Sequence, residues 1–272
     1  MVLQSLVSPF ITGNYDFWYL SFALPTAIAT ALLPPSWSTH RSPFISSNDL
    51  LTRGINVSVP NPPEGWQWIN VQAGYQIDTG VDGVPFGKSS FYATKVEIPF
   101  LQHPYIQHTS PLTFKSTVLF SSLSMTTSSQ LITGLRSRKT SFTNQTDSSY
   151  QAHDWLSLQN DDDESLNQST PMTETWSESL VRQSINGWFV GSGSGSIANK
   201  FTYTSKQSMK QFNSIQLELN LPKFLFKSFV ETSNLLKGSG IEMTDQGWIT
   251  IPSTGWKLFE SSKLESKAIS KI

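Results

Sequence analysis

The stretch from Trp66 to Phe100, WQWINVQAGYQIDTGVDGVPFGKSSFYATKVEIPF, decides the fold class. Residues 66–77 and 89–100 are rich in β-branched and aromatic side chains, and glycines, aspartates and a proline lie between them. Two such runs around turn-forming residues predict an antiparallel hairpin. In the second run, Lys95 and Glu97 mix with apolar side chains, which predicts a strand with one solvated face. We expect the rest of the chain to pack on this hairpin.

Short β-type runs separated by turn residues continue on both sides of the hairpin. Proline-bounded residues 25–33 and the apolar-faced segment 223–237 predict two helices. Many short strands with few helices predict a mainly β (α+β) fold, a single β-barrel or double-sheet domain over residues 1–272. We expect a polar loop at about 144–179 and a frayed tail from about 261. The further strands predicted are 15–22, 51–59, 112–120, 130–135, 185–190, 200–204, 214–221, 241–243, 248–251 and 256–259.

The composition argues against a nucleic-acid partner. The formal net charge is −1, only 14% of the residues are charged, and no basic patch stands out. Nine Trp, seventeen Phe and seven Tyr form a heavy aromatic load. This load fits a β-sheet core, and it also fits an aromatic-lined pocket for an apolar small molecule.

The chain has no cysteine, which excludes disulfides, thiolate catalysis and cysteine-based metal sites. This favours a cytoplasmic protein. Three Asn-x-Ser/Thr sequons leave secretion open. The apolar run 17–33 is too interrupted for a membrane span, which needs about 20 apolar residues. A homo-oligomer is compatible with the sequence.

Several motifs that resemble catalytic or binding signatures fail on spacing. Asp78-Thr79-Gly80 has no second copy for an aspartic-protease pair, and the GSGSGS run at 191–196 lacks phosphate-loop spacing. The acidic run 161–164 lacks the pattern of a calcium loop. The four histidines have no metal-ligand spacing, so we expect no metal site. No serine-nucleophile elbow occurs.

The basic cluster RSRKT at 136–140 follows a predicted strand. Arg136 and Arg138 would depress the pKa of Lys139, and a lysine activated in this way can form a Schiff base with a carbonyl substrate. A solvated basic turn is the alternative.

The order of LLPPSW, GWQWINVQAGY, a strand ending in VEIPF, and QLITGLRSRKTSF resembles the acetoacetate decarboxylase-like β-barrel superfamily. The resemblance is closest to its fungal secondary-metabolism branch and covers roughly residues 10–140. The family pattern of G-R-E followed by P-K-K has only Gly134-Leu-Arg136-Ser-Arg138-Lys139 as its counterpart here.

The resemblance implies an enzyme that acts, without a cofactor, on an apolar carbonyl compound. Lys139 would form the imine, Arg136 would lower its pKa, and Glu97 would orient the substrate or relay a proton. The remaining expected substrate contacts are Arg138, Gln72, Tyr92 and His103. A cofactor-free cyclase or isomerase, a non-catalytic ligand-binding barrel and a structural interaction module remain alternatives.

Overall fold

The computed structural model confirms a mainly β fold with a few short helices. The described helices are α1 (Thr26–Ala31), η1 (Pro35–Trp37), α2 (Ser47–Thr52), α3 (Leu123–Thr133) and α5 (Leu221–Phe224). The strands are β1 (Phe10–Pro25), β2 (Trp66–Val81), β3 (Ser89–Leu101), β4 (Leu112–Phe120), β5 (Ser137–Lys139), β6 (Phe142–Thr143), β7 (Ser149–Ala152), β8 (Leu156–Asn160), β9 (Trp188–Gly191), β10 (Ala198–Tyr203), β11 (Ser208–Leu219) and β12 (Leu235–Thr250). The structure describes residues 10–37, 42–53, 55, 59–81, 88–102, 111–143, 146, 148–160, 180, 184, 187–191, 198–203, 208–226 and 235–250.

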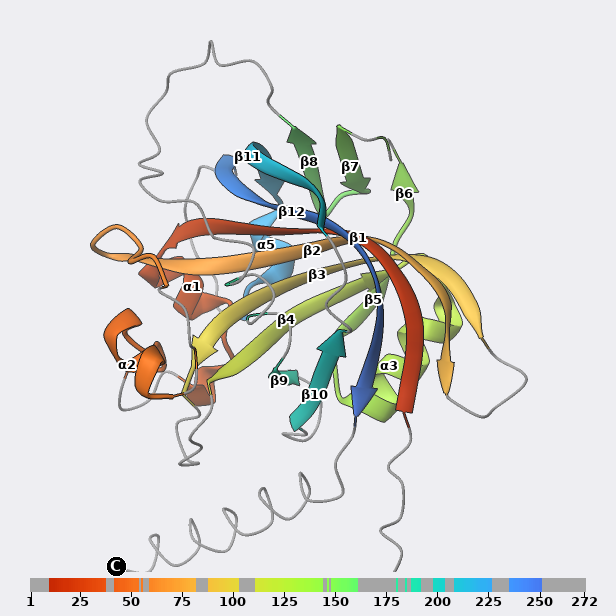
Figure 1. Ribbon diagram of the computed structural model, residues 1–272, viewed down its shortest axis with the longest axis horizontal. Helices are drawn as coiled ribbons and strands as arrows, with labels where there is room; N and C mark the ends of the chain where they lie inside the picture. The colour runs from red at the N-terminus through yellow and green to blue at the C-terminus, as the bar shows by residue number, and fades with distance from the viewer. Residues whose placement is uncertain are drawn as a thin grey trace, which may run out of the picture.

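The strands form one curled sheet whose pairings close into a ring (Figure 1). β1, β2, β3, β4, β9, β10 and β12 pair in that order, and β12 pairs again with β1. From β12 the sheet also branches through β11, β8, β7 and β6. The predicted hairpin is confirmed, since β2 and β3 pair antiparallel from Asn70 opposite Glu97 to Gln76 opposite Phe91.

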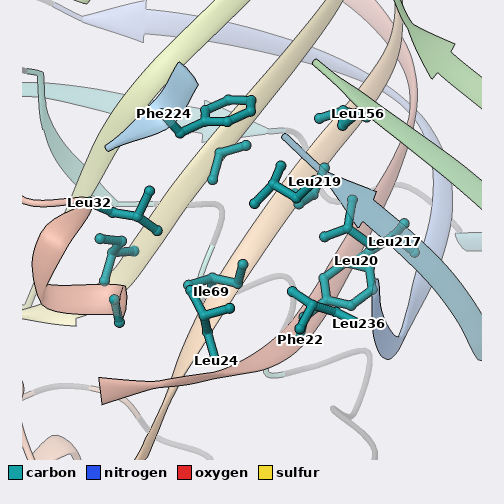
Figure 2. Close-up of a cluster of buried hydrophobic side chains, with 14 of the residues drawn as sticks. Leu20, Phe22, Leu24, Leu32, Ile69, Leu156, Leu217, Leu219, Phe224 and Leu236 are labelled. Carbon is teal, nitrogen blue, oxygen red and sulfur yellow. The ribbon is translucent and has the colours of Figure 1, made fainter. Parts of the chain in front are cut away.

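Strands β1 to β4 have buried side chains on both faces, and each face has its own cluster. One cluster lies between β1–β4 and a cover formed by α1, α5, β8 and β11 (Figure 2). A ring of seven strands has room inside only for side chains, so this covered face is the outer one. The second cluster therefore fills the ring, and it includes Tyr15, Tyr19, Phe91, Phe120 and Phe189.

Parts of two predicted strands, residues 51–52 of 51–59 and residues 130–133 of 130–135, are helical in the structure. Residues 51 and 52 end α2, which begins because the Ser46 side chain accepts a hydrogen bond from the amide of Asp49. Residues 130–133 end α3, which is capped by Ser122 and by Gly134 at φ 65°. In both places the β-type composition misled the prediction, and the capping residues decided the structure.

The C-terminal part also differs from the prediction. Only residues 221–224 form the helix α5, and residues 235–237 already belong to β12. β12 is one strand where two short ones were predicted, because it pairs with β1 on one side and with β10 and β11 on the other. Residues 227–234, the strand predicted at 256–259 and the tail lie outside the described residues.

The polar segment predicted as a loop contains the strands β7 and β8, which alternate buried and more exposed positions. Residues 161–179 lie outside the described part. The solvated face predicted for β3 is also absent, because Lys95 and Glu97 are only 5% and 3% exposed. Both side chains point into the ring. No described helix has the length and apolar character needed to cross a membrane.

Candidate active site

A layer of polar side chains crosses the inner face of the ring on four adjacent strands. Because side chains alternate along a strand, cross-strand partners share a face. One row consists of Tyr19, Gln72 and Lys95, and the next consists of Ser21, Asn70, Glu97 and Lys115. All seven side chains are buried, so their polar atoms depend on one another for partners.

Glu97 and Lys115 form a buried ion pair through Oε1 and Nζ. A register shift between β3 and β4 makes this pair possible. Val96 lies opposite Thr117, whereas Glu97 lies opposite Lys115, so Ser116 is an extra residue. Such a bulge turns the following side chain, and here it directs Lys115 toward the carboxylate. The ammonium of Lys115 also lies 4.6 Å from the centre of the Phe189 ring.

Tyr19 joins the second carboxylate oxygen to a small hydrogen-bond network. Its hydroxyl lies 3.4 Å from Glu97 Oε2, accepts from Asn70 Nδ2 at 2.8 Å, and is 2.9 Å from Ser184 Oγ. Ser21 donates to Asn70 Oδ1 at 2.9 Å and fixes the orientation of that amide. Burial, and then the charge of Glu97, raise the pKa of Tyr19 well above 10.0, so its hydroxyl keeps its proton.

Lys95 is the second buried lysine of the layer. Its Nζ donates to Gln72 Oε1 at 2.7 Å and lies 5.6 Å from the centre of the Tyr15 ring. Burial lowers the pKa of Lys95 well below 10.5, and the charge of Lys115 lowers it further, while Glu97 opposes the shift. One carboxylate cannot neutralise two buried ammonium groups. The arrangement therefore favours a neutral, nucleophilic amine on Lys95 beside the charged pair.

The structure places two of the predicted site residues, Glu97 and Gln72, in this layer. The half-buried Arg136 is elsewhere, and its guanidinium donates to the carbonyls of Lys223 and Phe224 at the end of α5. It also stacks on the Phe226 ring, 5.0 Å from the ring centre. Through these contacts, Arg136 stabilises the C-terminal end of α5 by satisfying its free carbonyl groups.

The other predicted residues do not join the layer. Arg138 and Lys139 are exposed on β5. Tyr92 packs at the outer face, against the rings of Tyr75 and Phe142. His103 lies outside the described residues. That Lys139 forms an imine stays a prediction. The ring interior contains two other lysines, Lys95 and Lys115, that are also candidates for imine formation.

Sequence reasoning missed Lys95, Lys115 and Tyr19. The available signal was a lysine inside an otherwise uncharged strand, as in LTFKSTVLF, and a lysine and a glutamate two residues apart in ATKVEIPF. Charged residues in such strands are rarely buried unless they are paired, and the pairing depends on a bulge that the sequence does not reveal. Among the described residues, no group of three His, Asp or Glu side chains is placed to hold a metal ion.

The sequence matches no known family model and no curated protein. Similar solved structures include an acetoacetate decarboxylase-like enzyme from Sphingomonas wittichii, with 10% identity, a TM-score of 0.48, and 92% of this chain and 94% of that chain covered. Acetoacetate decarboxylase from Legionella pneumophila has 11% identity, a TM-score of 0.45 and 88% of each chain covered. The enduracididine biosynthesis enzyme MppR, complexed with the condensation product of pyruvate and imidazole 4-carboxaldehyde, has 8% identity, a TM-score of 0.48, and 91% and 89% covered.

Proposed function

We propose that this chain is an enzyme that forms an imine between Lys95 and the carbonyl carbon of an apolar small molecule. The observation that carries the proposal is a buried lysine with a lowered pKa beside the Lys115–Glu97 ion pair. Removing an amine from water and placing it near a second cation are the two ways to make lysine nucleophilic at neutral pH.

The reaction that fits this amine best is decarboxylation of a β-keto acid. The neutral Lys95 nitrogen attacks the ketone carbon, and the resulting carbinolamine takes up one proton and loses water to give a protonated imine. The bond to the carboxylate then breaks, its electrons move to the iminium nitrogen, and carbon dioxide leaves. The resulting enamine takes a proton on carbon, and water hydrolyses the imine to release the ketone and Lys95. The iminium nitrogen is the electron sink, so the reaction needs no cofactor.

The neighbouring residues have separate roles in this proposal. Burial lowers the pKa of Lys95, the cation of Lys115 lowers it further, and Glu97 holds Lys115 in place through the ion pair. Glu97 can relay a proton from water to the enamine carbon, and Tyr19, which keeps its own proton, orients the Glu97 carboxylate. Gln72 holds the amine through its Oε1 atom.

Borohydride trapping tests the proposal. The protein is incubated with a panel of β-keto acids and β-diketones, reduced, digested and mapped by mass spectrometry. We expect an adduct on Lys95 that is lost in Lys95→Met and kept in the matched control Lys139→Met. If wild type carries an adduct on Lys139 and the adduct persists in Lys95→Met, the imine forms on Lys139, as predicted from the sequence, and the proposal for Lys95 is wrong. No adduct on any lysine would refute imine chemistry for this panel.

The aromatic lining of the ring favours a second candidate function. The rings of Tyr15, Phe17, Phe91, Phe120 and Phe189 share the inner face with the polar layer. A cofactor-free cyclase or isomerase could hold a reactive conformer against these rings without a covalent bond. Turnover of a substrate without a trapped adduct would favour that function, and binding without turnover would favour a ligand-binding barrel. Cytoplasmic location and a role in fungal secondary metabolism remain part of the proposal.

A further inference from the structure

A hollow of about 230 Å³ lies at one end of the ring, beside α2. Its floor is apolar and buried, and it includes Leu50, Val59, Trp68 and Phe100. Its rim is polar, with exposed Ser42 and Asn61 among the rim residues. A hollow with an apolar floor and a polar rim suits a ligand whose inner part is apolar.

Two strands that line the hollow, β2 and β3, also carry residues of the polar layer. On β2, Trp68 of the hollow is two residues from Asn70, and on β3, Pro99 of the hollow is two residues from Glu97. Residues two apart share a face of a strand and are separated by about 7 Å. The hollow is thus one side-chain layer beyond Glu97 and two layers, about 13 Å, beyond Lys95.

The backbone at Phe100 is shaped to line this hollow. Phe100 has φ 57°, a left-handed conformation that a phenylalanine rarely adopts. The register of β3 with β4 shifts at this point, so the adjacent residues Pro99 and Phe100 both face the hollow. The conformation is held by a hydrogen bond from the amide of Ile45 to the carbonyl of Phe100, at 3.0 Å. Strained backbone of this kind persists where neighbouring contacts hold it, and it clusters at ligand sites.

We propose that this hollow binds the apolar tail of the substrate whose carbonyl group reacts at Lys95. The inference rests on the proposed function and names its substrate class as carbonyl compounds with an alkyl or similarly apolar tail. The volume of the hollow is enough for only part of a ligand, because a pocket that holds a whole drug-sized ligand measures about 300–1,000 Å³. The two-layer spacing excludes a compound as short as acetone from filling both places at once.

A matched pair of variants on α2 tests this assignment. Ser47 lines the hollow, and its neighbour Asn48 is exposed and does not line it. Ser47→Phe therefore fills the hollow, whereas Asn48→Phe adds the same ring to the outside of the same helix. Ser42→Phe fills the hollow from a different segment, in case Ser47→Phe disturbs folding.

The first readout is the ketone concentration at which borohydride traps half of the protein, for acetone and for methyl octyl ketone. Each buried methylene is worth roughly fourfold in affinity, so we expect wild type to capture methyl octyl ketone at least about tenfold more readily. Ser47→Phe should reduce the capture of methyl octyl ketone more than the capture of acetone, whereas Asn48→Phe should keep the wild-type difference between the two ketones. The assignment would be overturned if wild type captured both ketones equally well. It would also be overturned if Ser47→Phe and Ser42→Phe each reduced the capture of both ketones by the same factor.

The second readout does not depend on imine chemistry. Calorimetry with octyl alcohol, which has no carbonyl group, should show binding to wild type and Asn48→Phe and a loss of binding in Ser47→Phe. If trapping fails and this pattern holds, the proposed function is wrong and the apolar site stands. If trapping succeeds on Lys95 and octyl alcohol binds all three proteins alike, the apolar site is refuted and the imine chemistry stands.

Discussion

A double-mutant cycle on Glu97 and Lys115 should show that the two residues depend on each other for stability. Their side chains are only 3% and 6% exposed, so removing either one leaves the other charge buried without its partner. Removing one member of a buried pair costs about 3–5 kcal/mol, against about 0–1 kcal/mol for a surface pair. We therefore expect Lys115→Met and Glu97→Gln each to lower the free energy of unfolding by roughly 3–5 kcal/mol.

The double variant should be less destabilised than the sum of the two single variants, because it contains neither isolated charge. We expect a coupling free energy of at least about 2 kcal/mol, measured by urea unfolding of the four proteins. Lys139→Met is the control, because Lys139 is exposed, and it should stay within about 0.5 kcal/mol of wild type. The buried pair would be refuted if each single variant lost only about 1 kcal/mol of unfolding free energy and the two losses simply added in the double variant.

Three further outcomes follow from the contacts. The folded state lowers the pKa of Lys95, so the unfolded state binds more protons between neutral pH and 10.5. In thermal unfolding, the stability of wild type relative to Lys95→Met should therefore increase as the pH rises through this range. A stability difference that does not change with pH would contradict the lowered pKa of Lys95. Arg136→Ala should cost about 1–2 kcal/mol through the lost hydrogen bonds to the end of α5, with the trapped fraction unchanged; a matching loss of trapping would place Arg136 in the site after all. Gly74→Ala should lower the free energy of unfolding by about 1–3 kcal/mol, because a Cβ at position 74 on β2 would overlap the backbone of β1. Unchanged stability in denaturant unfolding would show that β1 and β2 can move apart to accommodate the methyl group.

The hairpin and most strands could be predicted because they depend on local composition. Trp66–Phe100 contains two β-type runs around a glycine-rich turn, and the structure pairs them as expected. The helices α2 and α3 could not be predicted from composition, since Ser46 and Ser122 act through single capping hydrogen bonds. A closer search for cap residues would have found both.

The candidate site was only partly predictable, because it depends on pairing between strands far apart in the sequence. Glu97 and Gln72 were expected to serve the site and lie in its polar layer. Lys95 was assigned to a solvated face, since a lysine in a strand is usually exposed. Its burial follows from closure of the ring by β12, more than 130 residues later in the chain. Lys139 attracted attention through its basic neighbours, although β5 leaves it exposed.

The pKa of the Lys95 amine is the measurement that tests the central claim most directly. Isotope-edited NMR of the lysine ε-carbons, followed as the pH is raised, reports each amine without requiring reagent access, and Lys95→Met assigns the signal. We predict a midpoint well below 10.5, which rises when Lys115→Met removes the neighbouring cation. A midpoint near 10.5 that does not respond to Lys115→Met would contradict a neutral Lys95 and the imine chemistry built on it.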